Sequence, residues 1–147
     1  MKKLKNLLPI AFFFLSILFI GTSCDNDSNP TPNDNQCNYQ GLTYLDNSGN
    51  IITQIPENNL TTDYFTSGAN VEIWDNTNPG DTFIVTNAVT VGAVDNSPQI
   101  KINNANLTGV VTCQRAENNT VGDELRLDIV ITGGAEAELC VVIDSVN

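Results

Sequence analysis

The sequence predicts an all-β fold, an antiparallel β-sandwich of about seven strands with immunoglobulin-like or Greek-key connections. Two observations support this prediction. From residue 37 onward, short runs rich in Val, Ile, Thr and aromatic residues are separated by clusters of Asn, Asp, Gly and Pro, as in strands joined by turns. The same region has no convincing helical period. A small β-barrel is the alternative arrangement of such strands.

Strands are expected at seven places in this region, and the two longest are expected to bend or break near Asn87 and at Asn103-Asn104. A short helical turn is the only candidate helix, at residues 56–65, where Thr61 and Thr62 are candidate caps. The expected strands span residues 41–46, 51–55, 70–75, 82–95, 99–113, 124–132 and 138–146.

The clearest strand is the one at residues 124–132. Its aliphatic residues at positions 125, 127, 129 and 131 alternate with Glu124, Arg126 and Asp128, which indicates one buried face and one solvated face. The isoleucines on either side of Lys101 follow the same pattern. The apolar residues at 83, 85, 89, 91 and 93 share one phase and are expected to face the core.

Two turn sequences favour antiparallel neighbours. Residues 46–50, Asp-Asn-Ser-Gly-Asn, follow the first expected strand, and residues 132–135, Thr-Gly-Gly-Ala, precede the last one. Both have the composition of hairpin turns.

The first 24 residues predict export. Lysines at positions 2, 3 and 5 precede an apolar run over residues 7–20, which gives way to small residues before Cys24. This run of 14 residues is shorter than the about 20 residues that a membrane-spanning helix needs, and it fits the apolar segment of a secretory signal. An uncleaved signal anchor is the alternative.

The residues Gly21-Thr22-Ser23-Cys24 resemble the lipobox of bacterial lipoproteins, although Gly21 stands where Leu is usual. The resemblance implies cleavage of residues 1–23, a diacylglycerol thioether on Cys24 and acylation of its freed amine. The polar, acidic residues 25–28 are similar to the surface-export signal of Bacteroidetes-type lipoproteins, which implies an outer-membrane protein that faces the cell surface. Each buried lipid methylene contributes ~0.8 kcal/mol, so two or three chains hold a protein on a membrane.

Residues 24–36 are expected to be the lipidated cysteine and a disordered tether. Residues 25–36 contain two prolines and no aliphatic or aromatic side chain, so no apolar burial offsets the entropy of ordering them. At ~3.1 Å per residue such a tether reaches at most about 40 Å. Residues 37–147 then form the β domain.

The charge of the mature chain excludes some partners. Three of the six basic residues leave with the signal, so three basic residues remain against 17 acidic ones, a net charge of −14. This charge disfavours nucleic acids and electrostatic docking on anionic lipids. It is typical of a well-solvated surface, with divalent-cation binding as the sharper alternative. The chain has no His, which removes a common general base and zinc ligand.

Three cysteines remain if Cys24 is lipidated, and an exported compartment permits a disulfide. In a simple meander the strand at 124–132 separates Cys113 from Cys140 by about 9 to 10 Å, beyond the ~7 Å limit for bridged Cα atoms. The first and last strands of a sandwich often run side by side. We therefore expect a disulfide between Cys37 and Cys140, with Cys113 buried and free; three free thiols are the alternative.

Trp74 is the only tryptophan, and its phase places it with Glu72 on the face opposite the apolar residues 71 and 73. An outward Trp, with Tyr64 and Phe65 nearby, is a candidate platform for stacking a sugar. Cover by a loop, or partial burial of both faces, is the alternative.

Two weaker candidate sites lie in the second half of the chain. The turn at residues 75–81 holds Asp75 and Asp81, which are candidate Ca²⁺ ligands, although Asx and Pro-Gly residues also serve ordinary turns. Asp144-Ser145-Val146 resembles the short O-glycosylation motif of exported Bacteroidetes proteins, which implies Ser145 as a candidate glycosylation site.

These features predict a non-enzymatic, membrane-anchored lipoprotein whose β-sandwich serves binding or structure, with protein partners expected in an envelope complex. The alternative is a carbohydrate-binding surface module that uses Trp74. A carboxylate-dependent hydrolase ranks last. The sequence has no Cys-His pair, no glycine-rich phosphate loop and no metal-ligand spacing, so no cofactor is expected beyond the candidate Ca²⁺.

Overall fold

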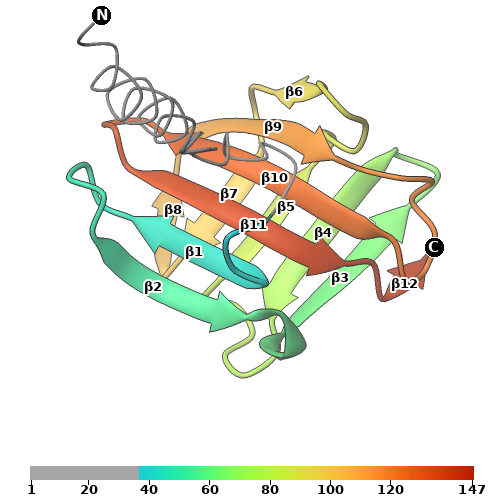
Figure 1. Ribbon diagram of the computed structural model, residues 1–147, viewed down its shortest axis with the longest axis horizontal. Helices are drawn as coiled ribbons and strands as arrows, with labels where there is room; N and C mark the ends of the chain where they lie inside the picture. Colours follow the sequence, from blue (N-terminus) through green and yellow to red (C-terminus); the bar gives the residue numbers. More distant parts are fainter. Residues whose placement is uncertain (1–36) are drawn as a thin grey trace, which may run out of the picture. The chain divides into compact units, whose positions relative to one another are not determined.

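The computed structural model describes residues 37–147. The expected signal (1–23) and tether (24–36) lie outside the described residues. The described chain forms two six-stranded sheets packed face to face (Figure 1). Sheet A has the order β2-β1-β11-β10-β9-β6, and sheet B has the order β12-β3-β4-β5-β7-β8. Neither sheet closes into a barrel, so the fold is a β-sandwich, as the sequence predicts.

Twelve strands, rather than about seven, make up the two sheets, and all pair antiparallel except β12 with β3. With six strands each, the sheets are larger than those of an immunoglobulin constant domain. The strands are β1 (Gly41–Leu45), β2 (Ile51–Pro56), β3 (Leu60–Phe65), β4 (Asn70–Asp75), β5 (Phe83–Thr86), β6 (Val94–Asp95), β7 (Gln99–Ile102), β8 (Ala105–Leu107), β9 (Gly109–Arg115), β10 (Glu124–Ile131), β11 (Glu136–Val142) and β12 (Ser145–Val146).

The higher count arises because three expected strands are broken and because β3 lies where no strand was expected. The strand expected at 82–95 becomes β5 and β6, the one at 99–113 becomes β7, β8 and β9, and the one at 138–146 becomes β11 and β12. The break after β7 lies at the predicted turn: Asn103 and Asn104 have φ values of 51° and 65°, a left-handed conformation that Asn tolerates.

The candidate helical turn at 56–65 is wrong for most of its length. Only Glu57–Asn59 forms a short 3₁₀ turn, and β3 follows it at once. Leu60 and Thr62 are buried, so this segment alternates between two faces as a strand does. The Thr62 N–H donates to an Asp144 carboxylate oxygen at 2.8 Å, a partner 82 residues away that sequence reasoning cannot see.

The expected phase of β5 is also wrong. Ile84 and Thr86 face the core, whereas Phe83 and Val85 lie on the outer face of sheet B. The inward Thr86 hydroxyl is accommodated because it donates to the buried carboxylate of Asp95 at 2.9 Å. Thr86 and Asp95 thus occupy buried positions where hydrophobic residues are expected, because they form a hydrogen bond with each other.

One core fills the space between the two sheets. The alternation predicted for β10 is confirmed, and the isoleucines flanking Lys101 are buried as expected. The largest fully buried side chains are Leu42, Ile73, Ile84, Ile102, Leu125, Leu127, Ile129, Leu139, Ile143, Val71, Val111 and Val141. Within residues 37–147, no helix is long and apolar enough to span a membrane.

Both predicted hairpin turns are present. The Asp46 carboxylate accepts hydrogen bonds from the N–H groups of Ser48 and Asn50 at 2.8 and 2.9 Å. Hydrogen bonds from the Asn50 side chain, and then from these two N–H groups, hold the pKa of Asp46 below its usual value. At the other turn, Gly133 and Gly134 have φ values of 106° and 95°, which favour glycine.

Candidate functional site

Trp74 lies on the outer face of sheet B. On β4, Val71 and Ile73 are buried at 0% and 2% exposure, and Glu72 and Trp74 project to the opposite side, partly exposed. The side chains that adjoin the indole are set by the cross-strand register. Trp74 is directly opposite Thr61 on β3 and Phe83 on β5.

The structure does not bring the three predicted aromatic residues together. Tyr64 is opposite the inward Val71 and packs against the core. Phe65 shares the outer face but pairs with Asn70, four residues along β4 from Trp74, about 14 Å away at the usual strand dimensions. Phe83 takes the place expected for Tyr64 and Phe65.

Sequence reasoning missed Phe83 because it assigned this residue to the buried phase. Directly opposed side chains on one face of an antiparallel pair have Cβ atoms about 4.5 to 5.5 Å apart, so Trp74 and Phe83 form a contiguous aromatic pair. Lys101 on β7 is directly opposite Phe83 on its other side. The sequence signal that was available is the alternation of Ile84 and Thr86 with Phe83 and Val85. If Ile84 and Thr86 face the core, Phe83 faces outward, and the strand register then places it beside Trp74 and Lys101.

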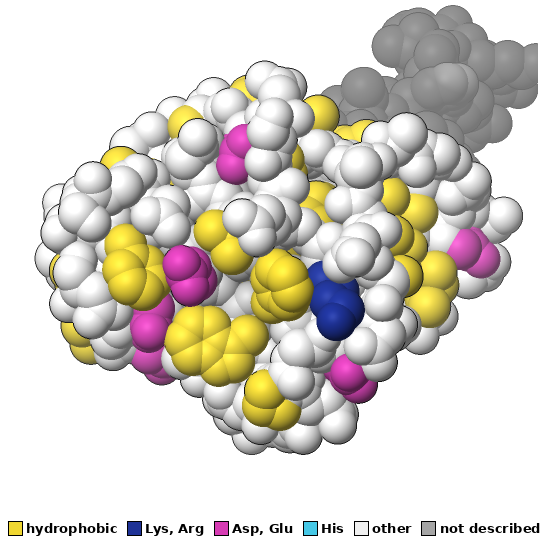
Figure 2. All heavy atoms as spheres, turned by 180° about the vertical axis from the view of Figure 1, so that it is seen from behind, with side chains coloured by type: hydrophobic (Ala, Val, Ile, Leu, Met, Phe, Trp, Pro, Cys, Tyr) yellow, Lys and Arg dark blue, Asp and Glu magenta, His cyan; other side chains and the backbone are white. Residues whose placement is uncertain are grey.

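Figure 2 shows this face of the molecule. Hydrophobic side chains gather in its middle, and acidic side chains and a basic one lie directly among them. The strands of this face contribute two acidic residues, Asp63 on β3 and Glu72 on β4, which are directly opposite each other. The face therefore combines an aromatic centre with charges of both signs.

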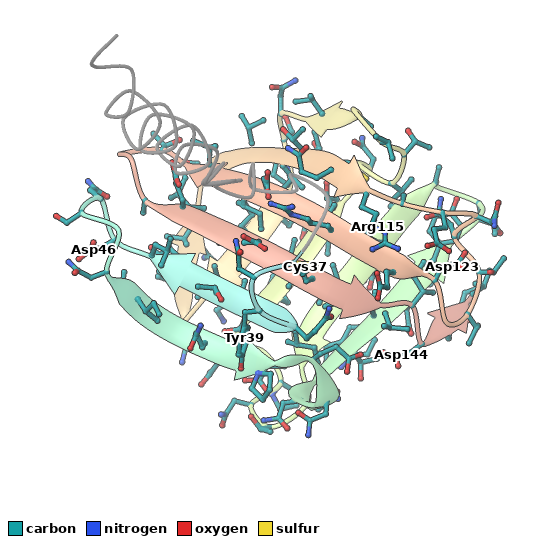
Figure 3. All side chains as sticks on the ribbon, viewed as in Figure 1. Cys37, Tyr39, Asp46, Arg115, Asp123 and Asp144 are labelled. Carbon is teal, nitrogen blue, oxygen red and sulfur yellow. A yellow bond between two sulfur atoms is a disulfide. The ribbon has the colours of Figure 1, made fainter. Side chains whose placement is uncertain are left out.

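The opposite side of the sandwich carries the disulfide. Cys37 and Cys140 are joined with a Cα–Cα distance of 6.0 Å, as the sequence predicts. The reasoning behind that prediction also holds, because β1 pairs with β11 and β10 separates β9 from β11. Cys140 alternates with the core-facing Leu139 and Val141 on β11, so the disulfide and Cys37 lie at the outer face of sheet A (Figure 3).

A carboxylate fixes the segment that follows Cys37. The Asn38 N–H donates to Glu138 Oε1 at 3.2 Å, and the Asn38 side-chain amide donates to Oε2 at 3.3 Å. Arg126 Nε lies 3.8 Å from the same carboxylate. Sγ of Cys37 and of Cys140 and a Glu138 oxygen lie within 4.8 Å of one another, but sulfurs joined in a disulfide cannot act as thiolate metal ligands.

Acidic residues crowd this part of sheet A. Asp128, Glu136 and Glu138 line a hollow of about 310 Å³ with Arg126. Burial raises the pKa of Asp128, and the Glu138 and Glu136 charges raise it further, while the Arg126 guanidinium, 3.6 Å from the Asp128 carboxylate, opposes them. The basic side chain compensates the carboxylates that the strand register places side by side.

Cys113 is free and fully buried, as expected. It faces the core, and its Sγ lies 3.5 Å from the Arg115 carbonyl oxygen. Burial raises the pKa of the Cys113 thiol to about 11. A thiol that is both inaccessible and protonated is a structural residue rather than a nucleophile.

Asp75 and Asp81 line one polar pocket of about 270 Å³, together with residues of β2 and Asn103. Asp75 is buried, and its Oδ1 accepts hydrogen bonds from the Thr77 N–H at 2.8 Å and the Thr77 hydroxyl at 2.6 Å. This is the bonding of an ordinary Asx turn. Asp75 thus has a structural task in the turn between β4 and β5.

Ser145, the candidate glycosylation residue, lies on β12 and is only partly exposed. Its hydroxyl donates to Asp63 Oδ1 at 2.7 Å and accepts from the Asn147 side chain at 3.0 Å. A glycan on this oxygen would have to replace the hydrogen bond that ties β12 to β3. Cys24, the predicted lipid-attachment residue, lies outside the described residues.

The chain matches no protein-family model, no curated protein and no solved structure. Its function is therefore argued from the sequence and from the two outer faces.

Proposed function

We propose that the chain is an exported lipoprotein, anchored through Cys24, whose β-sandwich is a non-enzymatic binding domain. The observation that carries this proposal is the disulfide between Cys37 and Cys140. Structural disulfides persist in oxidising compartments and are rare in the cytosol. The bridge thus supports export independently of the lipobox resemblance.

The charge of the mature chain agrees with a display role. Cys37, the first described residue, lies at the outer face of sheet A, and the aromatic pair lies on the outer face of sheet B. The net charge of −14 keeps such a domain soluble and away from anionic lipid headgroups.

Metabolic labelling tests the anchor. In a bacterium that processes lipoproteins, the wild-type protein is expected to incorporate an alkyne-tagged fatty acid, and Cys24→Ala is expected to lose the label. Cys113→Ala is the matched control and should label as the wild type does. Labelling of Cys24→Ala at the wild-type level would contradict lipidation at this residue.

A second candidate function is carbohydrate binding, and the pairing of Trp74 with Phe83 favours it. Aromatic rings in an open face present an apolar surface with hydrogen-bonding groups around it. Because Trp74 is the only tryptophan, its fluorescence reports this surface alone. A spectral shift with a polysaccharide supports the candidate, and an unchanged spectrum across a wide panel counts against it.

A further inference from the structure

Four side chains form a row across the outer face of sheet B. Thr61 is opposite Trp74, Trp74 is opposite Phe83, and Phe83 is opposite Lys101. Adjacent strands lie ~4.8 Å apart, so the row spans about 14 Å. Its centre is aromatic, and its two ends are polar.

Groups of opposite charge flank the aromatic pair. Glu72 lies two residues before Trp74 on β4, and Lys101 is the cross-strand neighbour of Phe83. Strand spacing and rise place Glu72 and Lys101 about 12 Å apart, on either side of the pair. Neither side chain makes a hydrogen bond or an ion pair within residues 37–147. Both are therefore available to a ligand.

The charge pattern discriminates between classes of ligand. An anionic ligand would meet Lys101 but also Glu72, Asp63 and the field of a domain with a net charge of −14. A cationic ligand would meet the carboxylates but also the ammonium group of Lys101, next to Phe83. A neutral, hydroxyl-rich ligand uses both groups, because hydroxyls donate to a carboxylate and accept from an ammonium.

The open geometry favours a polymer. Neither the hollow on sheet A nor the pocket at Asp75 includes Trp74 or Phe83, and Figure 2 shows the hydrophobic side chains at the surface of a broad face. Small ligands bind in concave sites that bury most of their surface. Aromatic rings exposed on a broad face suit a chain that continues past them in both directions.

We propose that Trp74 and Phe83 stack on a sugar unit of a neutral polysaccharide, with Glu72 accepting from its hydroxyls and Lys101 donating to them. This inference rests on the carbohydrate-binding function proposed above and names its ligand class and residues. It replaces Tyr64 and Phe65 by Phe83, Glu72 and Lys101.

Affinity gel electrophoresis of the folded protein tests the proposal. Native gels are cast with one soluble polysaccharide each: mixed-linkage β-glucan, galactomannan and xyloglucan as neutral probes, polygalacturonate as the anionic probe and chitosan as the cationic one. The wild type is expected to be retarded by at least one neutral probe and by neither charged probe. Trp74→Ala and Phe83→Ala are expected to abolish the retardation, and Glu72→Gln and Lys101→Met to weaken it several-fold.

Phe65→Ala is the matched control, since it removes an aromatic ring from the same face outside the row and should bind as the wild type does. Thermal unfolding of each variant verifies that it is folded. Retardation only by a charged probe, or binding that Glu72→Gln and Lys101→Met leave unchanged, would overturn this assignment while leaving carbohydrate binding in place. No retardation by any of the five probes would contradict both the residue assignment and carbohydrate binding itself.

Discussion

Asp95 illustrates how single residues hold this fold together. Its carboxylate is 7% exposed and accepts from the Thr86 hydroxyl at 2.9 Å, the Asn87 N–H at 3.1 Å and the Ser97 N–H at 2.8 Å. Three donors on both sides of a loop thus converge on one buried group. The carboxylate ties the end of β5 to β6, although these strands belong to different sheets.

Asp95→Ala is expected to lower the free energy of unfolding by about 2 to 4 kcal/mol, because it leaves the buried Thr86 hydroxyl and two part-buried N–H groups without their acceptor. Urea denaturation measures the change. Asp81→Ala is the control: the Asp81 side chain makes no hydrogen bond within residues 37–147, so a change within about 0.5 kcal/mol is expected. Equal effects of the two substitutions would contradict the role of Asp95.

Cys113 predicts a specific pH dependence of stability. Burial raises its pKa from 9.0 to about 11. Below pH 9 the thiol is protonated in both states. Between about pH 9 and pH 11 the unfolded chain releases the proton while the folded chain keeps it, so the free energy of unfolding falls as the pH rises.

The comparison with Cys113→Ala isolates this effect. At 1.36 kcal/mol per pKa unit, the stability difference between wild type and variant should shift by about 2 kcal/mol against the wild type between pH 8 and pH 10.5. Denaturant titrations at pH 8 and pH 10.5 measure the difference, and groups common to both proteins cancel. A difference that is independent of pH would show that Cys113 is not buried as a neutral thiol.

Residue-level predictions from sequence succeeded where a local rule applied. The outward phase of Trp74 follows from alternation along six residues, and Cys37 with Cys140 follows from strand spacing. The neighbours of Trp74 depend on the register between strands, which no local pattern records. Phe83 was placed in the core because the rule that apolar residues are buried ignores the hydrogen bond that allows Thr86 inside.

Among the strands, β1 depends on a glycine at its first residue. Gly41 has a φ of 128°, and a Cβ there would lie 2.8 Å from the Glu57 nitrogen and 2.9 Å from the Pro56 carbonyl carbon. Its neighbours are Pro56 on β2 and Cys140 on β11. The backbone of β2 therefore comes too close for any side chain at this position.

Gly41→Ala is expected to destabilise the domain by about 3 kcal/mol or more, since it combines backbone strain with steric overlap. Gly49 offers a matched control, because its φ is 80° and a Cβ there would meet no atom within 4 Å. Gly49→Ala should therefore cost only the strain, about 1 to 2 kcal/mol. The midpoints of thermal unfolding compare the two, and a larger loss at Gly49 would refute the packing described for β1.

The disulfide links elements that are far apart in the chain. It joins residues 103 positions apart and fixes the segment before β1 to the middle of β11. In the loop-entropy account, a bridge of this span stabilises a fold by about 4 to 5 kcal/mol.

Cys37→Ala/Cys140→Ala is expected to lower the free energy of unfolding by about 2 to 5 kcal/mol. Chemical denaturation measures the loss, and reduction of the wild type by dithiothreitol should reproduce it. In the Cys113→Ala variant, reduction of the disulfide should lower the free energy of unfolding as much as it does in the wild type. If the reductant instead destabilised the double variant, the bridge would be wrongly assigned.

Element boundaries were predictable only in part. Alternation identified β10 and turn residues identified the hairpins, because both signals are local. β3 was missed because its strand character depends on β4 and on Asp144, which binds the Thr62 N–H. Of the breaks in the long expected strands, the one after β7 lies where Asn103 and Asn104 adopt a left-handed backbone.

At the scale of the whole domain, the two outer faces carry different groups. Sheet A carries the disulfide and the acidic cluster around Arg126. Sheet B carries the aromatic row centred on Trp74 and Phe83. The strand and turn patterns predicted the sandwich and the charge predicted its acidic surface, but only the pairing of β1 with β11 shows that Cys37 lies at the outer face of sheet A.

The intact mass of the protein extracted from membranes tests the central claim, that a lipid-anchored, disulfide-bonded β domain is displayed outside the cytoplasm. We expect a species that begins at Cys24, carries the mass of the acyl groups and gains two hydrogens on reduction of the bridge between Cys37 and Cys140. A species that retains residues 1–23, or that carries no lipid, would contradict the proposal.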